Sequence, residues 1–252
     1  MDAEAMGILL LVVSFLVLLL MLILRGKKGP SPSVRSLLAF RDIRAETEYA
    51  AESGGAIHIA LGGGALHGED TITSLAGLQV VESLADTAVS YNIPPIITVG
   101  DPTLLPLADD ILRRVYERNG AVEMHDPSRV RFVAPSPVAY AAGAGNVIAM
   151  ENVTANIMAG AFGPEVSLIA DAGARRDLPQ SAAAAAPAAI GALYPVTDRL
   201  AVGEELYAAG AQMTEKRLYL VSLIAQDILR VVLVIAILGS AVAALLSSGL
   251  GR

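Results

Sequence analysis

Residues 56–68 read AIHIALGGGALHG, and this stretch decides the fold. Residues 56–61 form a short apolar run, which three consecutive glycines bring to an end. Residues 71–91 then place apolar side chains at the three- and four-residue spacing of a helix, with Asp70 or Thr71 as its N-cap. The pattern predicts one strand–loop–helix unit.

The same alternation continues along the chain. We expect further strands at 96–99, 130–133 and 166–170, and helices over 103–119, from Ser136-Pro137 onward, and over 202–213. Residues 188–193 fit a fifth strand, and a helix fits them almost equally well. This order predicts the α/β class, with an open, mostly parallel sheet and flanking helices between two transmembrane helices.

Two segments of small residues, 139–145 and 155–161, are expected on helix faces. Small side chains let helices approach a sheet or one another closely. The two segments therefore favour tight packing or contact between subunits over catalysis.

The composition excludes several kinds of site. The chain has 252 residues, of which 54% are hydrophobic, and it contains no Cys. Thiolate nucleophiles, iron–sulfur clusters and cysteine zinc sites are therefore impossible. Three scattered His residues make another metal site improbable, and no cofactor is expected.

Two uncharged runs, 5–24 and 231–251, are each long enough as helices to cross a bilayer. Basic residues flank both runs on the side of the central domain. The positive-inside rule then places the N-terminus outside and the central domain in the cytoplasm. We expect an integral protein of the bacterial inner membrane, with membrane lipid as a partner.

The rest of the chain divides by composition. Residues 29–52 read as a hinge and an amphipathic helix, 53–215 as the cytoplasmic α/β domain, and 216–230 as a juxtamembrane helix. The segment 53–215 has 18 acidic and 8 basic residues, a net charge of −10. Such a domain repels phosphate backbones, so no nucleic-acid partner is expected.

The glycine loop is the first candidate site. Backbone N–H groups of Gly62, Gly63 and Gly64, before a helix N-terminus, could hold a phosphate or another small ligand. The loop lacks the Lys of a Walker A motif, and His67 stands where the dinucleotide fingerprint needs its third glycine. The alternative is a flexible turn.

The ends of the expected strands supply four more candidates. His67, Asp101, Ser136 and Asp171 would gather at one edge of the sheet, where Ser136 could attack a substrate with His67 as base. No G-x-S-x-G elbow is present. The alternative is that all four serve as caps and turns, and no catalytic residue is assigned. His58, within the first strand, is expected to be a buried histidine with satisfied hydrogen bonds and no ligand.

Three phrases together carry a resemblance: PPIITVGDPTLLPLADD, NVTANIMAGAFGPEVSLIADAG and AVGEELYAAGAQM. They resemble an uncharacterised bacterial membrane family, a domain of unknown function, over most of residues 53–231. The resemblance implies two spans and a central cytoplasmic domain. It carries over no catalytic residue.

These observations predict a membrane-anchored structural or interaction protein that forms homo-oligomers through its α/β domain. The alternative is a sensory module that binds a small molecule or nucleotide at the glycine loop. A membrane-tethered hydrolase using Ser136 with His67 is the third hypothesis.

Overall fold

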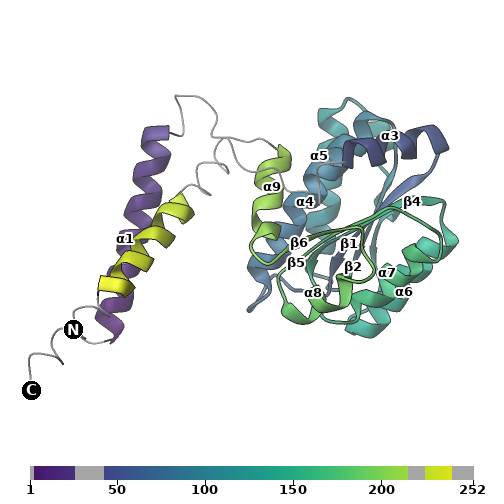
Figure 1. The fold of residues 1–252 in the computed structure, drawn as a ribbon. Helices are drawn as coiled ribbons and strands as arrows, with labels where there is room; N and C mark the ends of the chain where they lie inside the picture. The colour runs from purple at the N-terminus through teal and green to yellow at the C-terminus, as the bar shows by residue number, and fades with distance from the viewer. Residues whose placement is uncertain (1–2, 26–42, 215–224, 240–252) are drawn as a thin grey trace, which may run out of the picture. The chain divides into compact units, whose positions relative to one another are not determined.

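A computed structural model describes residues 3–25, 43–214 and 225–239 (Figure 1). The chain divides into two compact units. One unit comprises residues 1–34 and 215–252, and helix α1 (Ala3–Arg25) belongs to it. The other unit, residues 35–214, holds the sheet and the candidate site.

A six-stranded parallel sheet forms the centre of the second unit. Its strands are β1 (Ala56–Gly62), β2 (Pro95–Val99), β3 (Val130–Phe132), β4 (Val153–Ala161), β5 (Gln180–Ala184) and β6 (Arg199–Val202). They lie in the order β3-β2-β1-β4-β5-β6, and every neighbouring pair is parallel. The prediction of an α/β fold with a parallel sheet and flanking helices is confirmed. In this order the direction of winding reverses between β1 and β4, and ligands bind at such a switch point in open α/β sheets.

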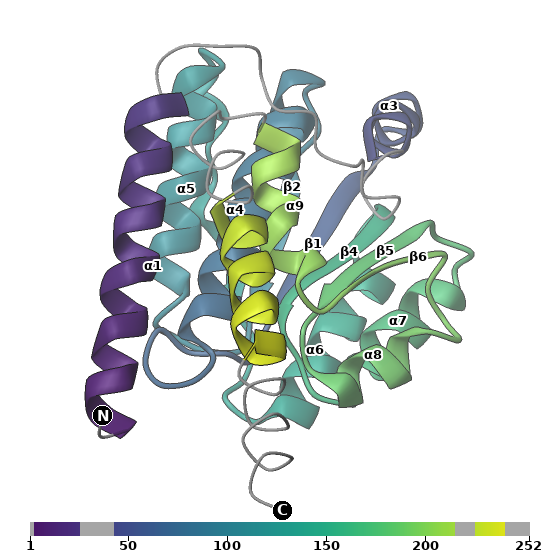
Figure 2. The same ribbon diagram turned by 60° about the vertical axis from the view of Figure 1, so that its left-hand side comes forward.

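Helices cover both faces of the sheet (Figures 1 and 2). One face carries α3 (Ile43–Ser53), α4 (Thr71–Ser90), α5 (Leu105–Arg118) and α9 (Glu205–Thr214). The opposite face carries α6 (Pro137–Met150), α7 (Val166–Ala174) and α8 (Pro187–Leu193).

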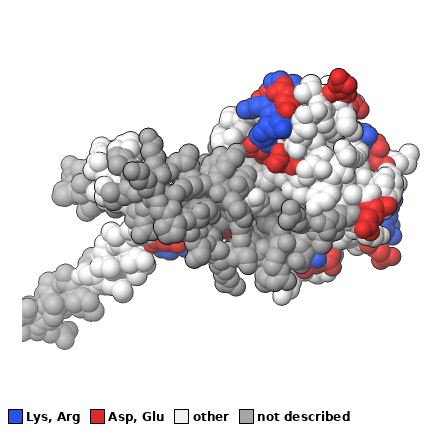
Figure 3. Space-filling view, turned by 90° about the horizontal axis from the view of Figure 1, so that it is seen from above, with Lys and Arg blue, Asp and Glu red and all other residues white. Residues whose placement is uncertain are grey.

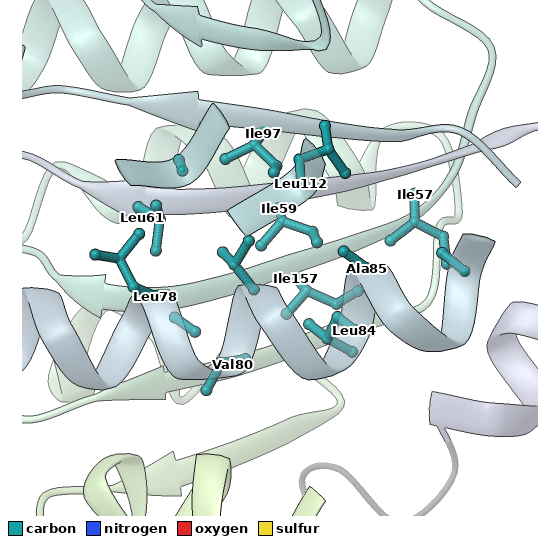
Figure 4. Close-up of a cluster of buried hydrophobic side chains, with 14 of the residues drawn as sticks. Ile57, Ile59, Leu61, Leu78, Val80, Leu84, Ala85, Ile97, Leu112 and Ile157 are labelled. Carbon is teal, nitrogen blue, oxygen red and sulfur yellow. The ribbon is translucent and has the colours of Figure 1, made fainter. Parts of the chain in front are cut away.

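Strand β1 shows how the sequence produces these two layers. Successive side chains of a strand point to opposite faces. Ile57, Ile59 and Leu61 therefore all pack toward α4, where they meet Leu78 and Leu84 (Figure 4). His58 and Ala60 point to the α6–α7 face. Burying each of the large aliphatic side chains contributes roughly 1.5–3 kcal/mol to stability.

Helix α4 approaches the sheet closely because small residues line the contact. A Cβ atom added to Gly77 would lie 2.6 Å from the carbonyl oxygen of Ala159 and 2.9 Å from Cδ2 of Leu61. The segment 155–161, expected on a helix face, is instead the inner part of β4. Its small side chains still serve close packing, but between a strand and a helix.

Two strand predictions were wrong. Residues 166–170 lie in α7, since a short apolar run cannot be distinguished from a buried helix by periodicity alone. Residues 188–193 lie in α8, which is the helical alternative. The alanine-rich strand β5 instead lies just before it and is buried throughout. The short edge strand β6 was not predicted.

The prediction of two transmembrane helices is corrected. Within residues 3–25, 43–214 and 225–239, no helix combines the length and the apolar composition needed to cross a membrane. Of the second expected span, 231–251, the structure describes residues 231–239, which are helical. The predictions of a membrane anchor and of an inner-membrane location depended on these two spans and are corrected for the same reason.

Parts of two other predicted segments lie outside the described residues. Of the segment 29–52, the structure describes residues 43–52, which belong to α3. Of the segment 216–230, it describes residues 225–230, which are helical.

The close approach at Gly77 gives the first testable prediction. Gly77→Ala should lower the free energy of unfolding by about 1–3 kcal/mol, because the added methyl group overpacks the contact with β4. Gly191→Ala in α8 is the matched control, since a Cβ there meets nothing within 4 Å. It should stabilise by roughly 0.5–1 kcal/mol through helix propensity. Chemical denaturation of the full chain measures both changes, and two changes of the same sign would contradict this account of the packing.

Candidate functional site

A pocket of about 230 Å³ opens at the carboxyl ends of β1, β4 and β5. It therefore lies at the switch point between β1 and β4, where the order of the strands favours a ligand site. Backbone and small side chains form most of its wall. The lining residues are Gly63, Gly64, Asp70, Thr73, Pro137, Ala161, Phe162, Gly163, Glu165, Ala185 and Ala186.

The turn after β1 shapes one wall of this pocket. Gly62 has φ +82°, a conformation that residues with a side chain rarely adopt. Its carbonyl oxygen accepts a hydrogen bond from the Gly100 N–H at 2.8 Å, and the Gly63 N–H donates to the Ala161 carbonyl at 3.0 Å. The β1–β4 register shifts between Ala60 and Gly62, and the two strands stay paired to the edge of the pocket, where Gly62 is opposite Ala161.

Three polar side chains line the pocket, and two of them are acidic. Thr73 Oγ1 lies 3.1 Å from the Tyr207 hydroxyl, and Glu165 Oε1 accepts a hydrogen bond from the Gly163 N–H at 2.8 Å. Asp70 is exposed at the start of α4 and makes no side-chain capping bond. No Lys, Arg or His is among the lining residues that the structure describes. The two carboxylates therefore oppose the attraction of the helix N-terminus for anions.

A continuous row of buried polar side chains crosses the sheet behind the pocket. His58 Nδ1 lies 2.8 Å from Asn156 Oδ1, and His58 Nε2 lies 3.0 Å from Thr98 Oγ1. On one side the row continues from Asn156 Nδ2 to Gln180 Oε1 at 2.8 Å. On the other side it reaches Tyr140, whose hydroxyl lies 3.2 Å from Thr98 Oγ1.

The row ends at the backbone on both sides. Tyr140 donates to the Thr98 carbonyl and accepts from the Gly62 N–H, each at 3.1 Å. Gln180 Nε2 donates to the Ala170 carbonyl at 2.9 Å. Since Asn156 donates to Gln180, its oxygen is left to accept from His58 Nδ1, and Nε2 then accepts from the Thr98 hydroxyl. A neutral His58 ring therefore satisfies the hydrogen-bonding groups of both Asn156 and Thr98.

Burial determines the protonation states within this row. Burial lowers the pKa of His58 to about 4, so the ring is neutral near pH 7. Burial also raises the pKa of Tyr140 to about 12, which keeps its hydroxyl both donor and acceptor. The expectation that His58 is a buried, satisfied histidine is confirmed by its two hydrogen bonds.

The structure gathers only part of the predicted ligand set. Gly63 and Gly64 line the pocket, and Gly62 lies directly before them at the end of β1. The loop that follows is joined to the end of β2, because the Leu66 N–H donates to Thr103 Oγ1 at 3.1 Å.

The four candidate chemical groups do not form a set. Asp101 accepts from the Thr103 N–H at 2.8 Å and from the Thr103 hydroxyl, and so closes a turn. Ser136 is the N-cap residue of α6, next to the lining residue Pro137. Asp171 lies in α7 and follows no strand, and its carboxylate pairs at 2.8 Å with Arg175, the C-cap residue of that helix. His67 is exposed in the loop between β1 and α4. No hydrogen bond or ion pair joins any two of these four residues, all of which the structure describes.

Sequence reasoning missed Thr73, Phe162 and Glu165 in the pocket and Tyr140 behind it. Phe162 and Glu165 were missed because residues 153–161 were not recognised as a strand, so the loop after it did not count as a strand end. No group of three or more His, Cys, Asp or Glu that could hold a metal occurs in the described part of the chain.

Comparison with known proteins identifies one relationship. A family model described as a domain of unknown function, DUF6754, matches residues 1–250. The match bears out the resemblance to an uncharacterised family. No curated protein and no solved structure matches the chain.

The buried histidine predicts a pH-dependent stability. The folded-state pKa of His58 is about 4, below the 6.5 of an unperturbed histidine, so below pH 6.5 the unfolded chain binds the proton more readily. The free energy of unfolding should therefore fall as the pH falls from 6.5 to about 4, by about 3 kcal/mol from this group.

Urea denaturation of the full chain across this pH range, with His58→Gln as the comparison, measures the effect. Carboxylates with lowered pKa, such as Asp110 and Asp126, titrate in both proteins, so the difference between the two curves isolates the histidine. Parallel curves for the wild type and the variant between pH 6.5 and 4 would contradict the assignment.

Proposed function

We propose that this chain, which belongs to the DUF6754 family, is a small-molecule-binding module whose ligand occupies the pocket between β1 and β4. The observation that carries the proposal is the pocket itself. It lies at the one point of the sheet where the winding reverses. Glycine backbone forms part of its wall, and a buried hydrogen bond holds the peptide group directly before these glycines. We also propose, from the resemblance, that the family is bacterial.

The charge of the pocket favours a ligand that is cationic or neutral and rich in hydroxyl groups. Asp70 and Glu165 each bring a carboxylate, and Thr73 adds a hydroxyl. These groups accept hydrogen bonds from ammonium and hydroxyl groups and repel phosphate. The volume of about 230 Å³ lies below the roughly 300–1,000 Å³ of common ligand pockets, so we expect a small ligand or one that extends into solvent.

The surface charge fits a protein without a nucleic-acid partner. On the face drawn in Figure 3, acidic side chains lie beside the basic ones. Arg118, for example, lies 2.8 Å from Glu82 and 3.4 Å from Asp86. Basic groups paired in this way offer little to a phosphate backbone.

Two other hypotheses have less support. Self-assembly through the α/β domain stays a prediction, and the small residues of β4 that suggested it are used in the domain's own packing. A hydrolase would need hydrogen-bond reach between nucleophile and base. No hydrogen bond joins Ser136 to His67 in the described structure.

Gly63→Val tests the proposal, because a Cβ atom at this position meets no protein atom within 4 Å and Gly63 lines the pocket. The added side chain should fill the pocket without disturbing the fold. We expect ethanolamine or glycerol, but not inorganic phosphate, to raise the Tm of the wild type. At about one hundred times Kd the stabilisation should approach 2.7 kcal/mol.

The Gly63→Val variant should lose this shift. Gly191→Val, at an equally open glycine outside the pocket lining, should keep it. A shift that survives in Gly63→Val, or a stabilisation by phosphate that Gly63→Val abolishes, would contradict the proposal.

A further inference from the structure

We propose that Tyr140 is the positioning residue of the pocket, because its hydroxyl holds the peptide group of Gly62 and thereby places the pocket-lining Gly63 and Gly64. This role of Tyr140 deepens the proposed function. Only its expected effect on ligand binding rests on that function. Tyr140 does not line the pocket itself, so its effect on a ligand must pass through the glycine turn.

The contact between Tyr140 and the turn is direct and buried. The Gly62 N–H donates to the Tyr140 hydroxyl at 3.1 Å, and Tyr140 is only 1% exposed. Gly62 is also buried, so without this hydroxyl its N–H would lose its partner away from water. A single side-chain oxygen from α6 therefore satisfies the Gly62 N–H in the turn after β1.

A close approach at Gly100 places the ring of Tyr140 against the same turn. A Cβ atom on Gly100 would lie 2.9 Å from Cγ of Tyr140, 2.9 Å from Cα of Gly63 and 3.0 Å from the Gly62 oxygen. Any side chain there would collide with both the ring and the turn. The end of β2 thus keeps Tyr140 and the pocket wall in contact.

The hydroxyl of Tyr140 is held from the other side by the buried row. It donates to the Thr98 carbonyl at 3.1 Å, and Thr98 Oγ1 in turn contacts His58 at 3.0 Å. These partners lie on β2 and β1, and His58 connects them to Asn156 on β4. The turn at the pocket is therefore held by the Tyr140 side chain of α6, which is itself fixed to the backbone of β2.

Amide hydrogen exchange of the full chain tests this role without any ligand. Tyr140→Phe removes only the hydroxyl, and we expect exchange of the backbone amides at residues 62–64 to rise about tenfold while protection elsewhere in the sheet is kept. Tyr116→Phe is the matched control: it removes a hydroxyl from another nearly buried tyrosine, on the opposite face. It should leave exchange at 62–64 unchanged. Unchanged exchange at 62–64 in Tyr140→Phe, or an equal rise throughout the domain, would overturn the inference.

Binding of ethanolamine supplies the second readout. Its Kd should rise about tenfold in Tyr140→Phe and stay unchanged in Tyr116→Phe. Equal affinity in wild type and Tyr140→Phe would overturn the inference. If the wild type bound neither ethanolamine nor glycerol, the proposed function would fail, and the exchange measurement would still decide whether Tyr140 holds the turn.

Discussion

The close contact of β1 with β4 at Gly62 is the constraint on which the rest of the domain depends. The two strands are paired along most of their length, and helix α4 lies against both through Gly77. The backbone of Gly62 has a positive φ and leaves no room for a side chain beside Ala161, and the next residue, Gly63, lines the pocket. The contact with α4 and part of the pocket wall are therefore built on the same strand pair.

Buried polar side chains on the other face of the sheet constrain how the strands align. His58, Asn156 and Gln180 are fully or nearly fully buried, and each would be costly if left without a partner. They satisfy one another in a row because their strands are adjacent and in register: His58 is opposite Asn156, and Asn156 is opposite Gln180. Such a row tolerates only one alignment of the strands, whereas aliphatic side chains alone would accept several.

The sequence predicted the elements with strong local signals and missed those without them. The unit from β1 to α4 was predicted to within one residue at each end, because an apolar run, three glycines and a helical period follow one another. Strand β4 was missed because its Asn, Ala and Gly residues are typical of turns and helix faces as well. Its identity as a strand depends on pairing with β1, which lies about one hundred residues earlier in the chain. The glycines of the site could be predicted for the same local reason, whereas Tyr140 and Glu165 reach the site only through tertiary packing.

The lengths of the outer strands have a consequence for contacts between copies of the chain. β3 has three residues and β6 has four, so each free edge of the sheet offers few unpaired backbone groups. Long, flat edges invite another chain to add a strand, and short ones discourage it. Continuation of the sheet from one molecule into the next is thus disfavoured. Contacts between copies of this domain would then be made by side chains, which can be selective where an open backbone edge cannot.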